Sequence, residues 1–381
     1  MMDALIKHLL GLVQSGMTDV GEVLDVMVRL EPDDEECWIK EWSVLAQRLQ
    51  ERAEKAHAAG RDITAASAFL RASTYWRASL MYFSLPEDPR IRINAEASAR
   101  CYALYLAVSG YPGEFVKIPY EGGFLPGHFY RSPVAGENAP LLILTPGRDT
   151  WAEDTRWVYD NAVRRGVHCL VYDGPGQGFT LRLQGLPFRP DWEAVLGPVV
   201  DFALGLPGVD PDRIGLMGMS FGGFLSIRAA AFDKRIKLCI TDPGSISWGR
   251  GIINHLPEPV RDIVLGDGPL RGPTIWAMDK TPLNWLIRDY AWKHAVPHEE
   301  VFRTLLDYDN TAVLSQIECK TLVIDGAAEM SPGEARKLFD ALDCPKDYLL
   351  FDEDTTAQAH CQMGGYATGA ELLFDWIDEN L

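Results

Sequence analysis

A chain of 381 residues is long enough for one large hydrophobic core with an accessory domain. Its hydrophobic share of 47% excludes disorder as the main state, and its formal net charge of −18 disfavours nucleic acid and anionic membrane surfaces as partners. The seven cysteines are odd in number and contain no Cys-x-x-Cys, which fits neither a disulfide framework nor a zinc site. They indicate a reducing compartment, which we expect to be the cytoplasm.

Residues 1–110 are predicted to form a helical domain. The first 23 residues lack a basic leader and a small-residue cleavage site, so they indicate an amphipathic helix rather than a signal peptide. Two later segments repeat large apolar side chains at helical spacing, namely Trp38, Trp42, Leu45 and Leu49, then Phe69, Trp76, Leu80 and Phe83. A third helix is expected to follow Pro89 and to end at Gly110. No apolar stretch approaches the length of a membrane span.

An aromatic cluster near the end of this helical region has two interpretations. Trp76 and Tyr82, together with Tyr75 and Phe83, are candidates for lining a substrate pocket. The alternative is that the cluster is core, which is the more frequent outcome because aromatic side chains dominate buried area.

From residue 111 to residue 381 the pattern changes to short apolar strands alternating with helical stretches, which predicts a catalytic domain. The segments EFVKIPY and FLPGHFYR flank Glu121-Gly122-Gly123 and predict an antiparallel pair. The later strands are APLLILT, HCLVY, RIGLMG, IKLCITD, KTLVID and DYLLF. Apolar runs separated by helices are typical of parallel strands covered on both faces, so the fold class is α/β, with a doubly wound, mostly parallel sheet.

The stretch from about residue 245 to 316 is too long for an ordinary connection between strands. Its Trp, Pro and charged helical residues predict an inserted helical cap over the carboxyl edge of the sheet, where open α/β folds bind ligands. Trp248, at the start of this cap, is a further candidate for substrate contact.

The sharpest chemical signal is Gly218-Met219-Ser220-Phe221-Gly222, which follows the strand RIGLMG and precedes the helical run FLSIRAAAF. Strand, tight turn and helix are the context of a nucleophile elbow, in which glycines leave room for a strained serine. Ser220 is therefore the predicted nucleophile, and the alternative is a chance match in a glycine-rich turn.

A serine hydroxyl needs a base, and in this architecture the base lies after the last strand. His360 is the histidine in that loop, DEDTTAQAHCQMGG. The acid is expected after the preceding strand, KTLVID, where Glu329 stands four residues beyond Asp325, in the loop. We favour Glu329 as the acid and keep Asp325, at the end of the strand, as its rival.

An oxyanion hole would complete the chemistry. One donor is expected to be the main-chain N–H of Phe221, directly after the nucleophile. The second is expected from the main-chain N–H of Arg148 in the loop Pro146-Gly147-Arg148-Asp149-Thr150, with the guanidinium facing solvent or pairing with Asp149. Thr150 to Glu153 is interpreted as a capping box for the next helix, which gives Glu153 a structural role.

Other patterns predict no cofactor and no metal. The turn Asp173-Gly174-Pro175-Gly176-Gln177-Gly178 does not match a phosphate-binding fingerprint and is interpreted as a structural turn near the site. The sequence contains no His-Glu-x-x-His and no other metal-ligand cluster.

These pieces together resemble a branch of the α/β-hydrolase superfamily that has an N-terminal helical domain. The branch includes 2,6-dihydroxypseudooxynicotine hydrolase and fungal hydrolases that shorten polyketides. The resemblance covers most of the chain and is carried by YWRASLMYF, PGRDTWAED, DGPGQG, GMSFGG and AHCQMGG. Matched residue by residue, it implies Ser220, His360 and an oxyanion hole at Arg148 and Phe221, whereas Glu329 stands where the branch usually has Asp. A further catalytic carboxylate of the branch is not carried over to Asp242.

The sequence therefore predicts a serine hydrolase that acts at a carbonyl carbon of a small molecule. The resemblance favours cleavage of a C–C bond in a ketone or polyketide-like substrate, and it implies a homodimer. The chemistry residues also permit an esterase, and peptide cleavage is a third, less favoured alternative. The alternative from another class is a binding scaffold that keeps the fold with an idle site, although an intact Ser, His and acid argue against it.

Overall fold

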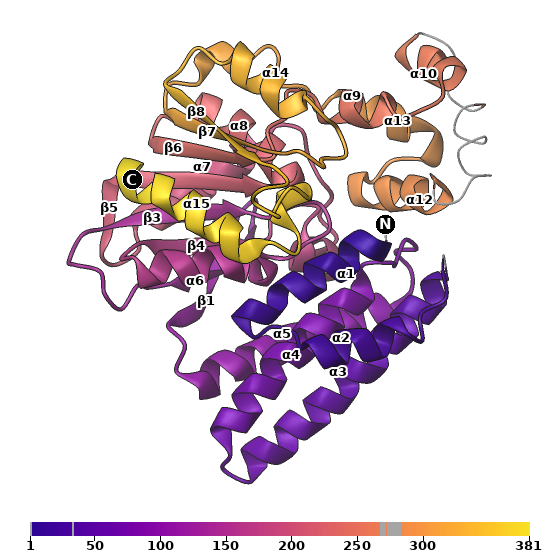
Figure 1. Cartoon of the computed structure of the whole chain (residues 1–381), viewed down its shortest axis with the longest axis vertical. Coiled ribbons are helices and arrows are strands. Elements are labelled where there is room, and N and C mark those ends of the chain that lie inside the picture. Colours follow the sequence, from indigo (N-terminus) through magenta and orange to yellow (C-terminus); the bar gives the residue numbers. More distant parts are fainter. Residues whose placement is uncertain (1, 33, 267–271, 273–282) are drawn as a thin grey trace.

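The computed structural model describes residues 2–32, 34–266, 272 and 283–381. The chain begins with a layer of helices that lies at one end of the molecule, below the sheet in Figure 1. These helices are α1 (Met2–Gly11), the 3-10 turn η1 (Leu12–Ser15), α2 (Val20–Met27), α3 (Glu35–Ala58), α4 (Asp62–Leu80) and α5 (Pro89–Ser109). Proline at its first turn starts α5, and Gly110 in the left-handed conformation ends it.

An eight-stranded sheet follows, in the order β1-β2-β4-β3-β5-β6-β7-β8. Its strands are β1 (Gly113–Tyr120), β2 (Gly123–Tyr130), β3 (Ala139–Thr145), β4 (His168–Tyr172), β5 (Val209–Met219), β6 (Ile236–Asp242), β7 (Lys320–Gly326) and β8 (Lys346–Phe351). The pairings β1–β2 and β2–β4 are antiparallel and the others are parallel. The predicted strands and the predicted hairpin are confirmed.

Helices cover both faces of the sheet, as the apolar strands require. On β3, Leu142 and Leu144 belong to one buried cluster while Leu141 and Ile143 belong to another, because successive side chains point to opposite faces. One face carries α6 (Arg156–Arg164) and α15 (Tyr366–Asn380), and the other carries α7 (Glu193–Leu204), α8 (Phe221–Phe232) and α14 (Glu334–Ala341). The cluster on the α6 and α15 face continues into the N-terminal helices, so the helical region and the sheet share one core.

A helical segment lies between β6 and β7, at the upper right of Figure 1. It contains α9 (Trp248–Ile253), α10 (Glu258–Leu265), α12 (Leu283–His294), η4 (His298–Glu300), α13 (Val301–Leu306) and η5 (Leu314–Gln316). Of the predicted cap, residues 267–271 and 273–282 lie outside the described residues. None of the helices in the described part of the chain combines the length and apolar character needed to cross a membrane.

Candidate active site

Ser220 occupies the turn between β5 and α8, with φ 55° and ψ −125°. A positive φ is strained for a residue with a side chain and is typical of functional turns. Glycines make the turn possible: a methyl group at Gly218 would overlap the carbonyl group of Gly222, and one at Gly222 would overlap the carbonyl oxygen of Thr145. In register, Thr145 of β3 and Thr241 of β6 flank Gly218, so Ser220 lies where the central strands end.

The imidazole of His360 bridges Ser220 and Glu329. Its Nε2 lies 2.8 Å from Oγ of Ser220, and its Nδ1 lies 2.7 Å from Oε2 of Glu329. The side chains of His360 and Glu329 are 13% and 5% exposed. A carboxylate at Nδ1 fixes the proton there and leaves Nε2 free to accept the serine proton. Burial lowers the pKa of His360, but the charge and hydrogen bond of Glu329 raise it above its ordinary 6.5 overall.

The two loops that carry Glu329 and His360 are tied together by their backbones. Ala328 and Ala359 form an isolated parallel bridge, and the N–H of Ala328 donates to the carbonyl of Gln358 at 2.9 Å. Asp325, the rival acid, instead accepts a hydrogen bond of 2.6 Å from the hydroxyl of Tyr348 on β8. The structure therefore brings Glu329, and not Asp325, to the imidazole.

Asp242, at the end of β6, is a buried carboxyl group to which the sequence assigned no role. Its carbonyl accepts the N–H of Ser220 at 2.6 Å, and its Oδ1 accepts from Nε2 of Gln362 at 2.9 Å. Its Oδ2 has no hydrogen-bond partner among the described residues. Burial, with a smaller contribution from Glu329, raises the pKa of Asp242 to about 7. The available sequence signal was its position at the end of the strand next to the elbow.

The loop after β3 lies against the nucleophile. A methyl group added at Gly147 would come within 2.9 Å of Cβ of Ser220. Oγ1 of Thr150 accepts the N–H of Gly147 at 3.0 Å, and Nε2 of Gln177 donates to the carbonyl of Gly147 at 3.2 Å. The main-chain N–H groups of Arg148 and Phe221 have no acceptor within the described ranges. Both are thus available to a ligand oxygen beside Ser220.

The guanidinium of Arg148 does not face solvent. It is buried, donates to Asp289 of α12 and lies 4.0 Å above the ring of Tyr290, while Asp149 is 3.4 Å away. The expected pairing with Asp149 is therefore the longer of two contacts, because the cap supplies a second acid, Asp289, that is distant in sequence.

The turn after β4 holds this loop, as its structural interpretation implies. Oδ1 of Asp173 accepts the N–H of Ala152 at 2.8 Å. The capping box, however, differs from the prediction: Oδ2 of Asp154, rather than Glu153, accepts the N–H of Trp151 at 3.1 Å. The helical turn begins one residue later than Thr150 indicated, so the capping acid also shifts by one residue.

The three aromatic candidates for substrate contact lie in different surroundings. Trp76 and Tyr82 belong to the core of the helical region, where Nε1 of Trp76 donates to Gln50 and the ring of Tyr82 packs against Trp38. Their positions match the core interpretation rather than a pocket lining. Trp248 lies against the ring of Phe221, 4.8 Å between centroids, and so borders the elbow.

A cavity of about 840 Å³ opens between the helical region, residues 181–187 and the cap. The residues that line this cavity include Ile91, Leu181, Arg182, Trp292 and Val296. Ser220 and His360 are not among them. In the described part of the chain, no three His, Cys, Asp or Glu side chains gather as a metal site would require.

An elbow serine, a bridged histidine and a mostly parallel sheet define an α/β-hydrolase, and the chain belongs to the alpha/beta hydrolase family, whose model matches residues 124–371. Hydrolase LUC6 of Fusarium sp is 32% identical over 98% of this chain and 94% of its own length. The 20-hydroxy-prefusarin hydrolase FUS2 of Gibberella moniliformis is 31% identical over 97% and 94%.

Among solved structures, that of 2,6-dihydroxy-pseudo-oxynicotine hydrolase superposes with a TM-score of 0.76 at 20% identity, covering 98% of this chain and 95% of that one. The match includes the N-terminal helices as well as the sheet, because nearly the whole chain is covered. The predicted resemblance and fold class are confirmed.

Proposed function

We propose that this protein is a serine hydrolase that attacks a carbonyl carbon of a small molecule, with Ser220 as nucleophile, His360 as base and Glu329 as the acid that orients it. The observation that carries the proposal is the position of His360, within hydrogen-bonding distance of both other residues. Two observations support the choice of acid: Oε1 of Glu329 has no hydrogen-bond partner in the part of the chain that the structure describes, and Asp325 is bonded separately to Tyr348.

The chemistry follows from this geometry. Nε2 of His360 takes the proton of Ser220, and the alkoxide adds to the carbonyl carbon. The oxyanion that forms is held by the N–H groups of Arg148 and Phe221, and one such donor is commonly worth about a hundredfold or more in rate. When the tetrahedral intermediate collapses, the leaving group takes the proton from His360, and water then releases the acyl group from Ser220.

The favoured substrate is a β-dicarbonyl or polyketide-like ketone, whose leaving group is an enolate carbon. The balanced reaction is R–CO–CH₂–CO–R′ plus water, giving R–COOH and CH₃–CO–R′. This choice rests on the resemblance of the whole chain, helical region included, and on relatives such as the hydrolase named for 20-hydroxy-prefusarin. An ester with an alkoxide leaving group passes through the same first steps.

The substrate class is tested by offering matched series of β-diketones and aryl esters to the purified protein and to Ser220→Ala. We expect the β-diketones to be cleaved to one acid and one methyl ketone, with a larger kcat/KM than the esters and no turnover by Ser220→Ala. Turnover of esters alone would replace C–C hydrolysis by esterase activity. Turnover of neither series would favour the binding scaffold.

A further inference from the structure

The loop that follows β3, residues 146–155, is held by two regions that are distant from it in sequence. Its first half carries Gly147, which lies against Ser220, and Arg148, the proposed second oxyanion donor. Such a donor acts only if it is fixed before the reaction, since a displacement of about 1 Å can cost about a hundredfold in rate. The contacts that fix this loop are therefore part of the chemistry of the site.

The cap holds the first half of the loop through buried charges. Arg148 donates to Asp289, and Lys293, one turn further along α12, contacts Asp149 and lies 3.0 Å from Oδ1 of Asp289. The side chains of Asp289 and Lys293 are each 1% exposed, and that of Arg148 is 6% exposed. A movement of the loop that separated such a buried pair would leave each charge without its partner, which is strongly unfavourable. These contacts therefore strongly favour the one loop geometry in which the pairs form.

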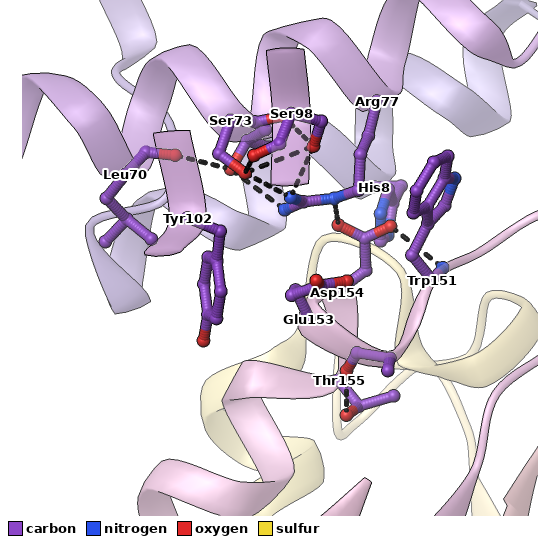
Figure 2. A network of polar contacts seen from close by, with 12 residues as sticks. His8, Leu70, Ser73, Arg77, Ser98, Tyr102, Trp151, Glu153, Asp154 and Thr155 are labelled. Atoms are coloured by element: carbon purple, nitrogen blue, oxygen red, sulfur yellow. Dashed lines mark hydrogen bonds and ion pairs between the residues drawn. The ribbon is translucent and has the colours of Figure 1, made fainter. Parts of the chain in front are cut away.

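The N-terminal helices hold the second half of the loop. Nε of Arg77, on α4, donates to Oδ1 of Asp154 at 2.8 Å, and both side chains are almost fully buried. Figure 2 shows the guanidinium reaching from α4 toward Asp154, with its far end bonded to Ser73 at 2.7 Å. The other carboxylate oxygen of Asp154 accepts the N–H of Trp151, so the ion pair is joined directly to the loop backbone.

We propose that Asp289 of the cap is a positioning residue for the main-chain N–H of Arg148, in a loop whose other end is anchored by Arg77 of the helical region, so that the cap influences the rate of acyl transfer. The inference rests on the proposed function. Both ion pairs end on the loop and not on the wall of the cavity. Holding the loop is therefore a role of the accessory helices that is separate from enclosing a substrate.

The test measures how fast a fluorophosphonate modifies Ser220, since phosphonylation also places negative charge in the oxyanion hole. Asp289→Asn keeps the shape and an acceptor for Arg148 but removes the charge. We expect its maximal labelling rate to fall about tenfold or more, with the probe concentration at half-maximal rate nearly unchanged. Asp149→Asn, at a partly exposed position, removes one of the two acidic partners of Lys293 and is expected to show a smaller loss of the same kind.

Glu35→Gln is the matched control, because Glu35 pairs with Arg288, the neighbour of Asp289 on α12, and ties the same helix to α3 without contacting the loop. It is expected to label at the wild-type rate. Circular dichroism at the assay temperature establishes that each variant is folded, and Asp149→Asn decides the matter if Asp289→Asn does not fold. Wild-type labelling rates in the folded loop variants, or an equal loss in Glu35→Gln, would overturn the inference. A wild-type protein that shows no Ser220-dependent labelling would instead contradict the proposed function, and the inference with it.

Discussion

Nε2 of His360 lies 2.8 Å from Oγ of Ser220, although 140 residues separate the two along the chain. Their meeting depends on the parallel sheet, because Ser220 follows a central strand and His360 follows the last one, and the carboxyl ends of these strands share one edge. The backbone bridge between Ala328 and Ala359 then sets the third member, Glu329, beside the imidazole.

Glu329 and Asp325 are distinguished by substitution. Glu329→Gln puts an uncharged amide against Nδ1 and removes the preference for the productive tautomer, so kcat is expected to fall by about a hundredfold or more. Asp325→Asn keeps an acceptor for the hydroxyl of Tyr348 and is expected to have a far smaller effect. Steady-state kinetics of both variants on one substrate make the comparison, and the opposite ranking would overturn the assignment of the acid.

The activity should depend on pH through His360, which must be neutral to act as a base. Because Glu329 raises the pKa of His360 above 6.5, kcat/KM should rise with pH and reach half its plateau above pH 6.5. Removal of the carboxylate in Glu329→Gln should move this midpoint to lower pH and should also lower the plateau value of kcat/KM. A profile of log kcat/KM from pH 5 to 9 measures both values, and an unchanged midpoint in the variant would contradict the role of Glu329.

Gly147→Ala tests the loop beside the nucleophile. The added methyl group would lie 2.9 Å from Cβ of Ser220 and 3.3 Å from the carbonyl oxygen of Met219, so the loop must move away from the elbow. We expect a drop in kcat of about tenfold or more with a smaller change in KM, because the oxyanion donor moves with the loop. Kinetics at a temperature where circular dichroism is unchanged make the test, and wild-type kcat would count against an oxyanion role for this loop.

Asp242 should make stability depend on pH. Its folded pKa of about 7 lies above the ordinary 3.8, so the folded protein holds a proton between these values that the unfolded chain releases. Its contribution to the free energy of unfolding therefore falls as pH rises from about 4 to about 7, by at most about 1.4 kcal/mol per pH unit. Asp242→Asn is uncharged throughout and keeps an acceptor for Gln362.

The Tm of Asp242→Asn relative to wild type should accordingly be higher at pH 7.5 than at pH 5. Asp340→Asn, at an exposed position, is the control and should show little pH dependence of this difference. An equal difference at both pH values would mean that Asp242 is ionised in the folded state even at low pH.

The sequence predicted the fold, the nucleophile motif and the positions of Ser220, His360 and Glu329 because each depends on local pattern and strand order. The sequence favoured Glu329 and kept Asp325 as a rival, because both lie near the end of the same strand. The coordinates separate the two, since the hydroxyl of Tyr348, which binds Asp325, comes from another strand. The burial of the Arg148 guanidinium could not be predicted from the sequence either, because its partner Asp289 is 141 residues away and belongs to an irregular insertion.

The aromatic candidates illustrate a different limit. Trp76 and Tyr82 have the composition of a pocket lining, but helical periodicity fixes only which face of a helix is apolar, not whether that face meets a ligand or another helix. In the structure it meets other helices. Asp242 is the opposite case, because the sequence assigned it no role and the structure buries it beneath the elbow. Its burial could not be predicted from the strand alone, since it depends on the loop after His360, where Gln362 binds its carboxyl group.

The central claim is that Ser220 is an activated nucleophile, and mass spectrometry after exposure to a fluorophosphonate tests it most directly. In the wild-type protein, we predict one covalent phosphonyl adduct, located by peptide mapping on Ser220, and none in Ser220→Ala. A folded wild-type protein without an adduct, or an adduct that persists unchanged in Ser220→Ala, would contradict the claim.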